Sequence, residues 1–313
     1  MLLRFFYPSH IMAELFDLAI SWDWEYDREF IAVVERELHI RSLKFFSISH
    51  HNTHEVVRKI QNRQLVFEAY LDRAAETDEN FAAVARAIRK TPARLVNPPE
   101  AVHHAADKAT MHLEFLTRGI HVPFTIIISP YAKKKDVELS LTDLAHLGRP
   151  FIIKPANTTG GGTGVILGAE TLKDVIESRQ HHKNDKYLLQ EKVEPRTLDG
   201  HRGWFRVFWI LGQVLPCWWN DLTHIYAPVT SHQLRKHHLR PLLTVTKKIH
   251  DVCDLDFFST EIAITPAGQF VVVDYVNEIC DMRPQSMYVD GVPDDVVKAI
   301  GRQIARLLQS TAR

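Results

Sequence analysis

Two acidic residues stand in strand-like sequence toward the end of the chain, where a buried carboxylate is costly unless something pairs with it. The sequence of residues 258–277, FSTEIAITPAGQFVVVDYVN, predicts two strands joined by a tight Pro-Ala-Gly turn. If that turn pairs Thr265 with Gly268, the two strands carry Glu261 and Asp274 as diagonal neighbours, at most about 7–8 Å apart.

Two carboxylates at that spacing repel each other unless a cation lies between them. Asn277 follows on the second strand and adds a neutral amide oxygen, so Glu261, Asp274 and Asn277 form a candidate metal site. Oxygen ligands of this kind suit Mg²⁺, which is usually held by few protein ligands together with phosphates. The alternative is an ordinary surface hairpin with one polar face.

A cluster of glycines and threonines follows the apolar run FIIK, which ends at Lys154. Clustered glycines let backbone N–H groups approach a polyanion. The cluster lacks the GxxxxGK[ST] of a P-loop and the third glycine of a dinucleotide-binding fingerprint, and a strand rather than a helix follows it. We expect a phosphate-binding flap at a hairpin tip, with Lys154 as a point charge, rather than a plain glycine turn. Its candidate binding residues are Thr159, Gly160, Gly161, Gly162, Thr163 and Gly164.

Further candidates are cationic, or lie where a strand turns polar. Lys108 lies in a predicted helix, and Arg206 interrupts the apolar strand WFRVFWI, where it needs an anionic partner or a solvated face. Arg283 follows the acidic hairpin and is a further candidate ligand for an anion. The segment LLQEKVEP turns polar before its proline, so its backbone can meet the edge of an adenine; an ordinary exit from strand to loop is the alternative. The residues concerned are Gln190, Glu191, Lys192, Val193 and Glu194.

Composition narrows the class of protein. The 313 residues are 45% hydrophobic and 24% charged, which suits a globular chain of two or three domains. The formal net charge is zero, so nucleic acid is not an expected partner. The three cysteines form no CxxC pair and fit a reducing compartment. The apolar start of the chain is interrupted by polar residues, so we expect a cytoplasmic protein with no membrane partner.

The order of predicted elements divides the chain into three parts. In residues 1–97, strands alternate with helices, which predicts βαβ units and a parallel sheet. The Asn-Pro-Pro sequence at residues 97–99 breaks that pattern, and one long helix is expected over residues 100–117. Residues 98–187 then carry the glycine flap, and residues 188–313 carry the acidic hairpin. We expect these to be a central and a carboxyl-terminal subdomain of α+β type.

Seven short segments occur in the order typical of one superfamily. They are NPPEAVHHAADK, GIHVPFT, PFIIKP, TTGGGTGV, LLQEKVEP, FRVF, and the pair STEIA and VVVDYVN. From residue 97 onward the chain therefore resembles the ATP-grasp superfamily, which includes glutathione synthetase and D-alanine–D-alanine ligase. The resemblance implies an ATP-grasp fold preceded by a βαβ domain, with ATP between two α+β subdomains.

The resemblance also implies roles for particular residues. Lys108, Lys154 and the glycine flap would contact phosphates, and Arg206 would face the transferring phosphoryl group. The backbone of Glu191 and Val193 would meet adenine, with Glu194 at the ribose. Glu261, Asp274 and Asn277 would hold Mg²⁺. The chain departs from the pattern at three positions: Asp274 replaces a glutamate, Trp204 replaces an aspartate, and Glu278 replaces the proline after the metal-binding asparagine.

The function expected from these features is that of an ATP- and Mg²⁺-dependent ligase. It would activate a small-molecule carboxylate as an acyl phosphate for attack by an amine, releasing ADP and phosphate, with Arg206, Lys154 and Arg283 as catalytic candidates. A small-molecule kinase on the same fold and a non-catalytic ATP-binding regulator are the alternatives. The identity of the acid and the amine stays open, and so does the choice between a monomer and a homodimer.

Overall fold

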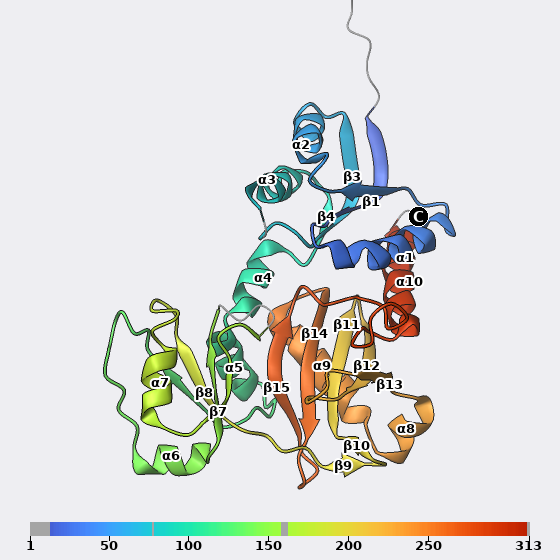
Figure 1. The fold of residues 1–313 in the computed structure, drawn as a ribbon. Coiled ribbons are helices and arrows are strands. Elements are labelled where there is room, and N and C mark those ends of the chain that lie inside the picture. Colours follow the sequence, from blue (N-terminus) through green and yellow to red (C-terminus); the bar gives the residue numbers. More distant parts are fainter. Residues whose placement is uncertain (1–12, 77, 158–161, 312–313) are drawn as a thin grey trace, which may run out of the picture. The chain divides into compact units, whose positions relative to one another are not determined.

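The computed structural model describes residues 13–76, 78–157 and 162–311 (Figure 1). The chain forms two compact units. The first contains the residues through Val96, Met282–Pro284, and the residues from Val297 onward; the second contains Asn97–Asp281 and Gln285–Val296. Each unit is described separately below.

The first unit is built on a four-stranded parallel sheet in the order β2-β1-β3-β4. The strands are β1 (Glu14–Ser21), β2 (Phe45–Ile48), β3 (Leu65–Asp72) and β4 (Arg94–Val96). The helices are η1 (Glu25–Asp27), α1 (Arg28–His39), α2 (Thr53–Gln61), α3 (Glu79–Ile88) and the greater part of α10 (Asp294–Thr311). These elements confirm the predicted βαβ pattern.

The connection from β1 to β2 runs one way along the sheet, and those from β2 to β3 and from β3 to β4 run the other way. Right-handed crossovers therefore place α1 on one face of this sheet, and α2 and α3 on the other (Figure 1). Helices α2 and α3 close a core against the sheet, with Val56, Ile60, Phe81 and Val84 as buried members. Helix α10 packs closely on α1, because a Cβ added at Gly301 would lie 3.1 Å from Val33.

The second unit contains two antiparallel sheets, of which one is ordered β5-β8-β6-β7. Its strands are β5 (Thr125–Ile128), β6 (Phe151–Pro155), β7 (Ile166–Ala169) and β8 (Tyr187–Glu191), with helices α6 (Leu141–Leu147) and α7 (Leu172–Ser178). Phe151 and Ile153 pack with the helices, so the alternate residues Ile152 and Lys154 point to the other face. The boundary expected at residue 188 falls inside β8, which pairs with β5 and β6.

The other sheet has the order β13-β12-β11-β14-β15. Its strands are β11 (Trp204–Ile210), β12 (Gln213–Trp219), β13 (Tyr226–Pro228), β14 (Phe257–Ile264) and β15 (Phe270–Asn277). One face packs against α4 (Pro99–Ala106), α5 (Lys108–Thr117) and α9 (Arg240–Cys253) in an extended apolar core. The remaining elements are β9 (Thr197–Leu198), β10 (His201–Arg202) and α8 (Ser231–Lys236).

The long helix expected over residues 100–117 is two helices, so that prediction was wrong. Asp107 leaves the helical conformation, with φ −76° and ψ 96°, and its carboxylate accepts hydrogen bonds from the backbone N–H groups of Ala109 and Thr110. An aspartate that can take the N-cap position competes with helix continuation. The break makes Lys108 the first residue of α5.

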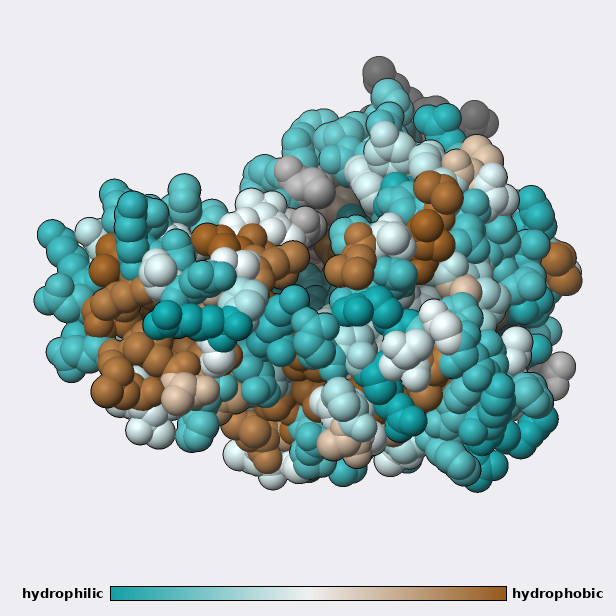
Figure 2. Space-filling view, turned by 60° about the horizontal axis from the view of Figure 1, so that its bottom comes forward, coloured by the Kyte–Doolittle hydropathy of each residue, from teal (hydrophilic) through white to brown (hydrophobic). Residues whose placement is uncertain are grey.

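No helix in the described ranges is long and apolar enough to cross a bilayer. Exposed large apolar side chains include Leu141, Leu167, Leu222 and Val289. Figure 2 shows one face, on which hydrophobic residues form separate patches among hydrophilic ones.

Candidate active site

The turn of the β14–β15 hairpin sets a register different from the one expected. The Gly268 N–H donates to the Thr265 carbonyl, and the Thr265 N–H donates to the Gln269 carbonyl. Gly268 has φ +84°, as the last residue of a three-residue hairpin loop requires. Thr265 is therefore opposite Gln269 rather than Gly268, and the prediction that Glu261 and Asp274 are diagonal neighbours was wrong.

Two β-bulges in β15 lie on either side of Asp274. The paired residues are Ile262 with Val272, Glu261 with Asp274, and Ser259 with Asn277, so β15 has one extra residue in each interval. In a regular strand, residues three apart point to opposite faces. Asp274 and Asn277 are three residues apart, but the bulge between them offsets this odd spacing. Both residues therefore lie opposite β14 residues, Glu261 and Ser259, that share one face.

Strand β11 extends this pairing into a row of three charged side chains. Arg206 lies directly opposite Glu261, which lies opposite Asp274. Arg206 Nη2 is 2.6 Å from Glu261 Oε1, and the Trp204 indole N–H donates to Glu261 Oε2 at 3.0 Å. The guanidinium also lies 5.0 Å from the ring centroid of Trp219. The strand-interior arginine thus has a carboxylate partner, and both oxygens of that carboxylate are engaged.

Lys154 reaches the same row from the other sheet of this unit. Its side chain is buried, and its Nζ donates to the Val273 carbonyl at 3.1 Å. The ammonium also lies 5.1 Å from the ring centroid of Tyr275. The backbone of Lys108 lies close to the end of β6, because its N–H donates a hydrogen bond to the carbonyl of Ala156, two residues after Lys154. The two lysines expected at a phosphate site therefore come from α5 and β6, beside the acidic strand.

Burial and the cations give the two carboxylates different proton affinities. Burial acts to raise the pKa of Asp274, but Lys154, Lys108 and Arg206 more than offset it and lower that pKa. Burial raises the pKa of Glu261 despite the attraction of Arg206. Burial also lowers the pKa of Lys154. Asp274 is therefore the carboxylate that stays ionised most readily.

A chain of buried polar groups links the two sheets beside Lys154. The Tyr275 hydroxyl lies 2.9 Å from His112 Nδ1 on α5 and accepts a hydrogen bond from Gln190 Nε2, which also donates to the Thr125 hydroxyl. Burial, with a contribution from Lys154, lowers the pKa of His112 to about 4. His112 is therefore neutral at pH 7, and its Nδ1 shares a hydrogen bond with the tyrosine hydroxyl. The sequence analysis did not single out His112 or Tyr275. The only signal for them is that each carries a polar atom at a position that the structure shows to be buried.

The remaining predicted residues are distributed more widely. Thr159, Gly160 and Gly161 lie outside the described residues, whereas Gly162, Thr163 and Gly164 are exposed in the loop between the antiparallel strands β6 and β7. The Glu191 carboxylate accepts from the Phe124 N–H, Lys192 pairs with Glu194, and Val193 is buried against Trp204 and Val271. Arg283 belongs to the first unit, where its guanidinium is 5.9 Å from the ring centroid of Trp24.

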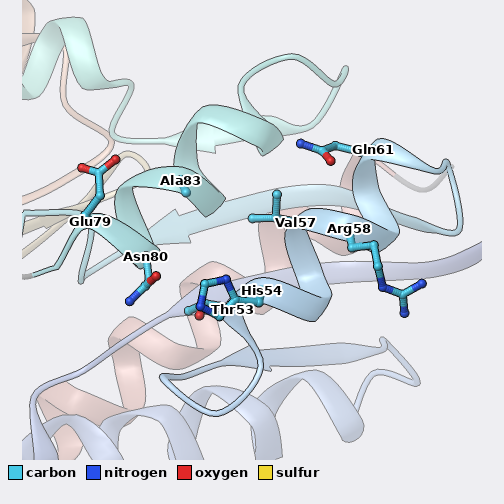
Figure 3. Close-up of a pocket in the computed structure, with 8 residues that line it drawn as sticks. All are labelled: Thr53, His54, Val57, Arg58, Gln61, Glu79, Asn80 and Ala83. Atoms are coloured by element: carbon cyan, nitrogen blue, oxygen red, sulfur yellow. The ribbon is translucent and has the colours of Figure 1, made fainter.

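Two cavities in the structure lie apart from the charged row. One, of about 280 Å³, lies between α2 and α3 of the first unit and is lined by residues such as His54 and Glu79 (Figure 3). Figure 3 shows Arg58 pointing away from the other lining side chains. The other, of about 450 Å³, is lined by Asn157 and residues 181–185.

The candidate metal ligands do not form a cluster of metal-binding side chains by themselves. Within the described part of the chain, no three histidine, cysteine, aspartate or glutamate residues are grouped so as to hold a metal ion. Glu261 and Asp274 supply two carboxylates, and Asn277 supplies an amide. This donor set is all oxygen, which excludes a thiolate or imidazole metal centre at these residues and suits a hard cation that takes its other ligands elsewhere.

Comparison with solved structures identifies the fold. An ATP-grasp RimK domain protein from Sphaerobacter thermophilus has a TM-score of 0.59 at 17% identity, over 93% of this chain and 98% of that chain. D-alanine–D-alanine ligase from Bacillus anthracis, complexed with ATP, has a TM-score of 0.60 at 11% identity, over 95% and 100%. The ATP-grasp ligase PsnB, complexed with minimal precursor, Mg and ADP, has a TM-score of 0.62 at 14% identity, over 95% and 98%.

These similarities extend over nearly the whole chain, so it has the ATP-grasp fold, which confirms the fold predicted from the seven segments. At the level of sequence alone, no protein-family profile matches the chain. No curated protein matches it either.

Proposed function

We propose that this protein is an ATP- and Mg²⁺-dependent ligase that joins a small-molecule carboxylate to an amine. The observation that carries the proposal is the row Arg206, Glu261 and Asp274, with Lys154 bound to the backbone beside Asp274. Three cations, counting Lys108, act on two carboxylates, so the residues themselves leave an excess of positive charge for an anion. The buried Arg206 Nε has no hydrogen-bond partner among the described residues, which leaves a donor for such an anion.

The fold supports a nucleotide as that anion. Two structures of the same fold are described as complexes with ATP and with Mg and ADP. In this chain, Lys108, Lys154 and the glycine loop would contact phosphates, and the backbone at Glu191 and Val193 would meet adenine, with Glu194 at the ribose. The nucleotide would lie between the two sheets of the second unit.

The donor set fits Mg²⁺, which would be held by Asp274 and Asn277 together with Glu261. When bound, the ion would offset the negative charge of the phosphate oxygens. Both Glu261 oxygens are engaged by Arg206 and Trp204, so Glu261 has to give up one of these contacts to become a ligand. Asp274 has no side-chain hydrogen bond or ion pair to give up among the described residues, and its lowered pKa keeps it ionised.

The reaction would proceed in two steps. An oxygen of the acid attacks the γ-phosphorus of ATP, and ADP leaves, giving an acyl phosphate. The amine nitrogen then attacks the acyl carbon, phosphate leaves, and the nitrogen loses a proton. Lys154 and Arg206 would offset charge on the transferring group, and Arg283 is a candidate ligand for an anionic substrate. No side chain need form a covalent bond to the substrate.

Release of ADP from Mg·ATP, measured against a panel of acids and amines, tests this proposal. We expect ADP only when both an acid and an amine are present, and we expect Lys154→Ala to release none. ADP formed with an alcohol alone, together with a stable phosphate ester, would show a kinase instead. Binding of ATP without turnover across a broad panel would favour a regulator.

A further inference from the structure

Lys154 carries a buried ammonium that contacts one strand, β15, of the opposite sheet. Its Nζ donates to the carbonyl of Val273 and lies over the ring of Tyr275, with only 6% of the residue exposed. Val273 and Tyr275 stand immediately before and after Asp274 on β15. The strand that carries the candidate metal ligand therefore also determines where the lysine charge lies.

The ring under Lys154 is fixed in place. Tyr275 is fully buried, and its hydroxyl is held by both His112 and Gln190. Its ring also packs against Phe115, with centroids 5.7 Å apart, and edge-on against His112 at 5.9 Å. Contacts from α5 and β8 thus leave this ring little freedom to rotate or move away.

A lysine held this way differs from a lysine on the surface. The side chain is flexible, so bringing it to one position costs conformational entropy. A cation desolvated over an aromatic face is attracted to that face, and this attraction is larger than at exposed sites. Ordering a side chain before its ligand arrives removes part of the cost of binding.

We propose that Tyr275 is a positioning residue for Lys154: its locked ring and the neighbouring Val273 carbonyl hold the ammonium beside Asp274 before a nucleotide binds. The effect on nucleotide affinity rests on the proposed function, whereas the placement of the ammonium does not. The tyrosine needs no contact with a substrate, because it acts through the lysine.

The placement is tested on the protein without nucleotide. Lysine labelled with ¹³C at Cε gives one NMR signal for each lysine, and Lys154→Arg identifies the signal of Lys154. Protons above a ring face are shifted upfield, so the Lys154 Hε signal should lie upfield of the surface lysines. Tyr275→Leu should move it toward their position, and Tyr275→Phe, which keeps the ring, should leave it upfield. A Lys154 signal among the surface lysines in the wild-type protein overturns the inference, even if Tyr275→Leu does not fold.

The effect on binding is measured by calorimetry with Mg²⁺ and the non-hydrolysable analogue AMPPNP. Tyr275→Leu should weaken binding by about tenfold, and Tyr275→Phe by no more than about threefold. Tyr187→Phe is the matched control: Tyr187 is also buried, and its hydroxyl donates to the Ser178 carbonyl, but it packs on the helix-covered side of the sheet. The control should bind as the wild type does.

Two outcomes separate this inference from the proposed function. Equal losses in Tyr275→Leu and Tyr275→Phe would show that the hydroxyl rather than the ring matters, and would overturn the positioning role. A wild-type protein that binds no AMPPNP contradicts the proposed function, while an upfield Lys154 signal in the same sample still supports the placement.

Discussion

Asp274 is the residue at which the charges of the site converge. Lys154, Lys108 and Arg206 together overcome the effect of burial on its pKa, and two bulges set it opposite Glu261. Glu261, in contrast, has its two oxygens occupied by Arg206 and Trp204. The aspartate is thus the carboxylate best prepared to meet a divalent cation, although its side chain is shorter than the glutamate expected there.

Asp274→Asn keeps the size of the side chain and removes its charge. We expect ADP formation to fall by at least about 100-fold, because charge stabilisation at a phosphoryl-transfer site depends on a correctly held cation. Thermal unfolding should show a folded protein, and Asp251→Asn on the exposed surface of α9 is the control. Wild-type rates in Asp274→Asn would remove this residue from the site.

His112 makes stability depend on pH. Its pKa is about 4 in the folded protein and near 6.5 when unfolded, so its contribution is complete above pH 6.5 and is lost as pH falls toward 4. Between pH 7 and 5, the unfolding free energy of the wild type should therefore fall by roughly 2 kcal/mol more than that of His112→Asn. Urea unfolding at the two pH values measures the difference. An equal fall in the wild type and in His112→Asn would mean that folding does not lower the pKa of His112.

At the scale of elements, connections between distant segments hold the site strands. Asn97, with φ +62°, lies just before α4, and its side-chain amide both accepts from the Phe257 N–H and donates to the Phe257 carbonyl. It thereby extends the hydrogen bonding of β14 at its first residue. Arg179, which is fully buried, similarly donates hydrogen bonds to backbone carbonyls of the loop after β5.

Replacing Asn97 separates the hydrogen bonds from the backbone conformation. Asn97→Ala should lower the unfolding free energy by about 2–3 kcal/mol, because two buried groups of Phe257 lose their partner and alanine disfavours positive φ. Asn97→Gly should cost about 1 kcal/mol less, since glycine accepts that conformation. Chemical denaturation gives both values, and an equal cost for the two variants would contradict the conformational part.

Arg179 should protect its loop from proteolysis. Its guanidinium donates to the carbonyls of Ser129, Lys134 and Lys135, which pins a segment that carries three consecutive lysines. In Arg179→Met we expect trypsin to cleave after residues 133–135 much sooner than in the wild type, with cleavage sites assigned by mass spectrometry. Arg86→Met, at an exposed ion pair, serves as the control and should leave the cleavage pattern unchanged.

Local patterns predicted most elements, but they did not predict how strands pair. The alternating strands and helices before Asn97 and the hairpin around Pro266 follow from periodicity and turn residues. The bulges beside Asp274 leave no mark in the sequence, because they depend on how β15 meets β14. The break at Asp107 was predictable in kind, since aspartate favours caps, but a continuous apolar pattern concealed it.

At the scale of the whole molecule, order along the chain was more informative than any one motif. Seven weak segments in sequence predicted the fold that comparison with solved structures shows. Tertiary contacts such as Trp204 with Glu261, or Tyr275 with His112 and Gln190, join residues 57 to 163 positions apart, so no local pattern contains them. The fold brings the charged row together from strands that lie far apart in the sequence.

The central claim is that an acyl phosphate forms from ATP and a carboxylic acid, and trapping with hydroxylamine tests it most directly. Hydroxylamine attacks an acyl phosphate to give a hydroxamate, so the natural amine need not be known. With Mg·ATP and a panel of acids, the wild-type protein should form a hydroxamate and ADP in equal amounts, and Lys154→Ala should form neither. ADP produced without any hydroxamate, accompanied by a stable phosphate ester of an alcohol, would contradict the account.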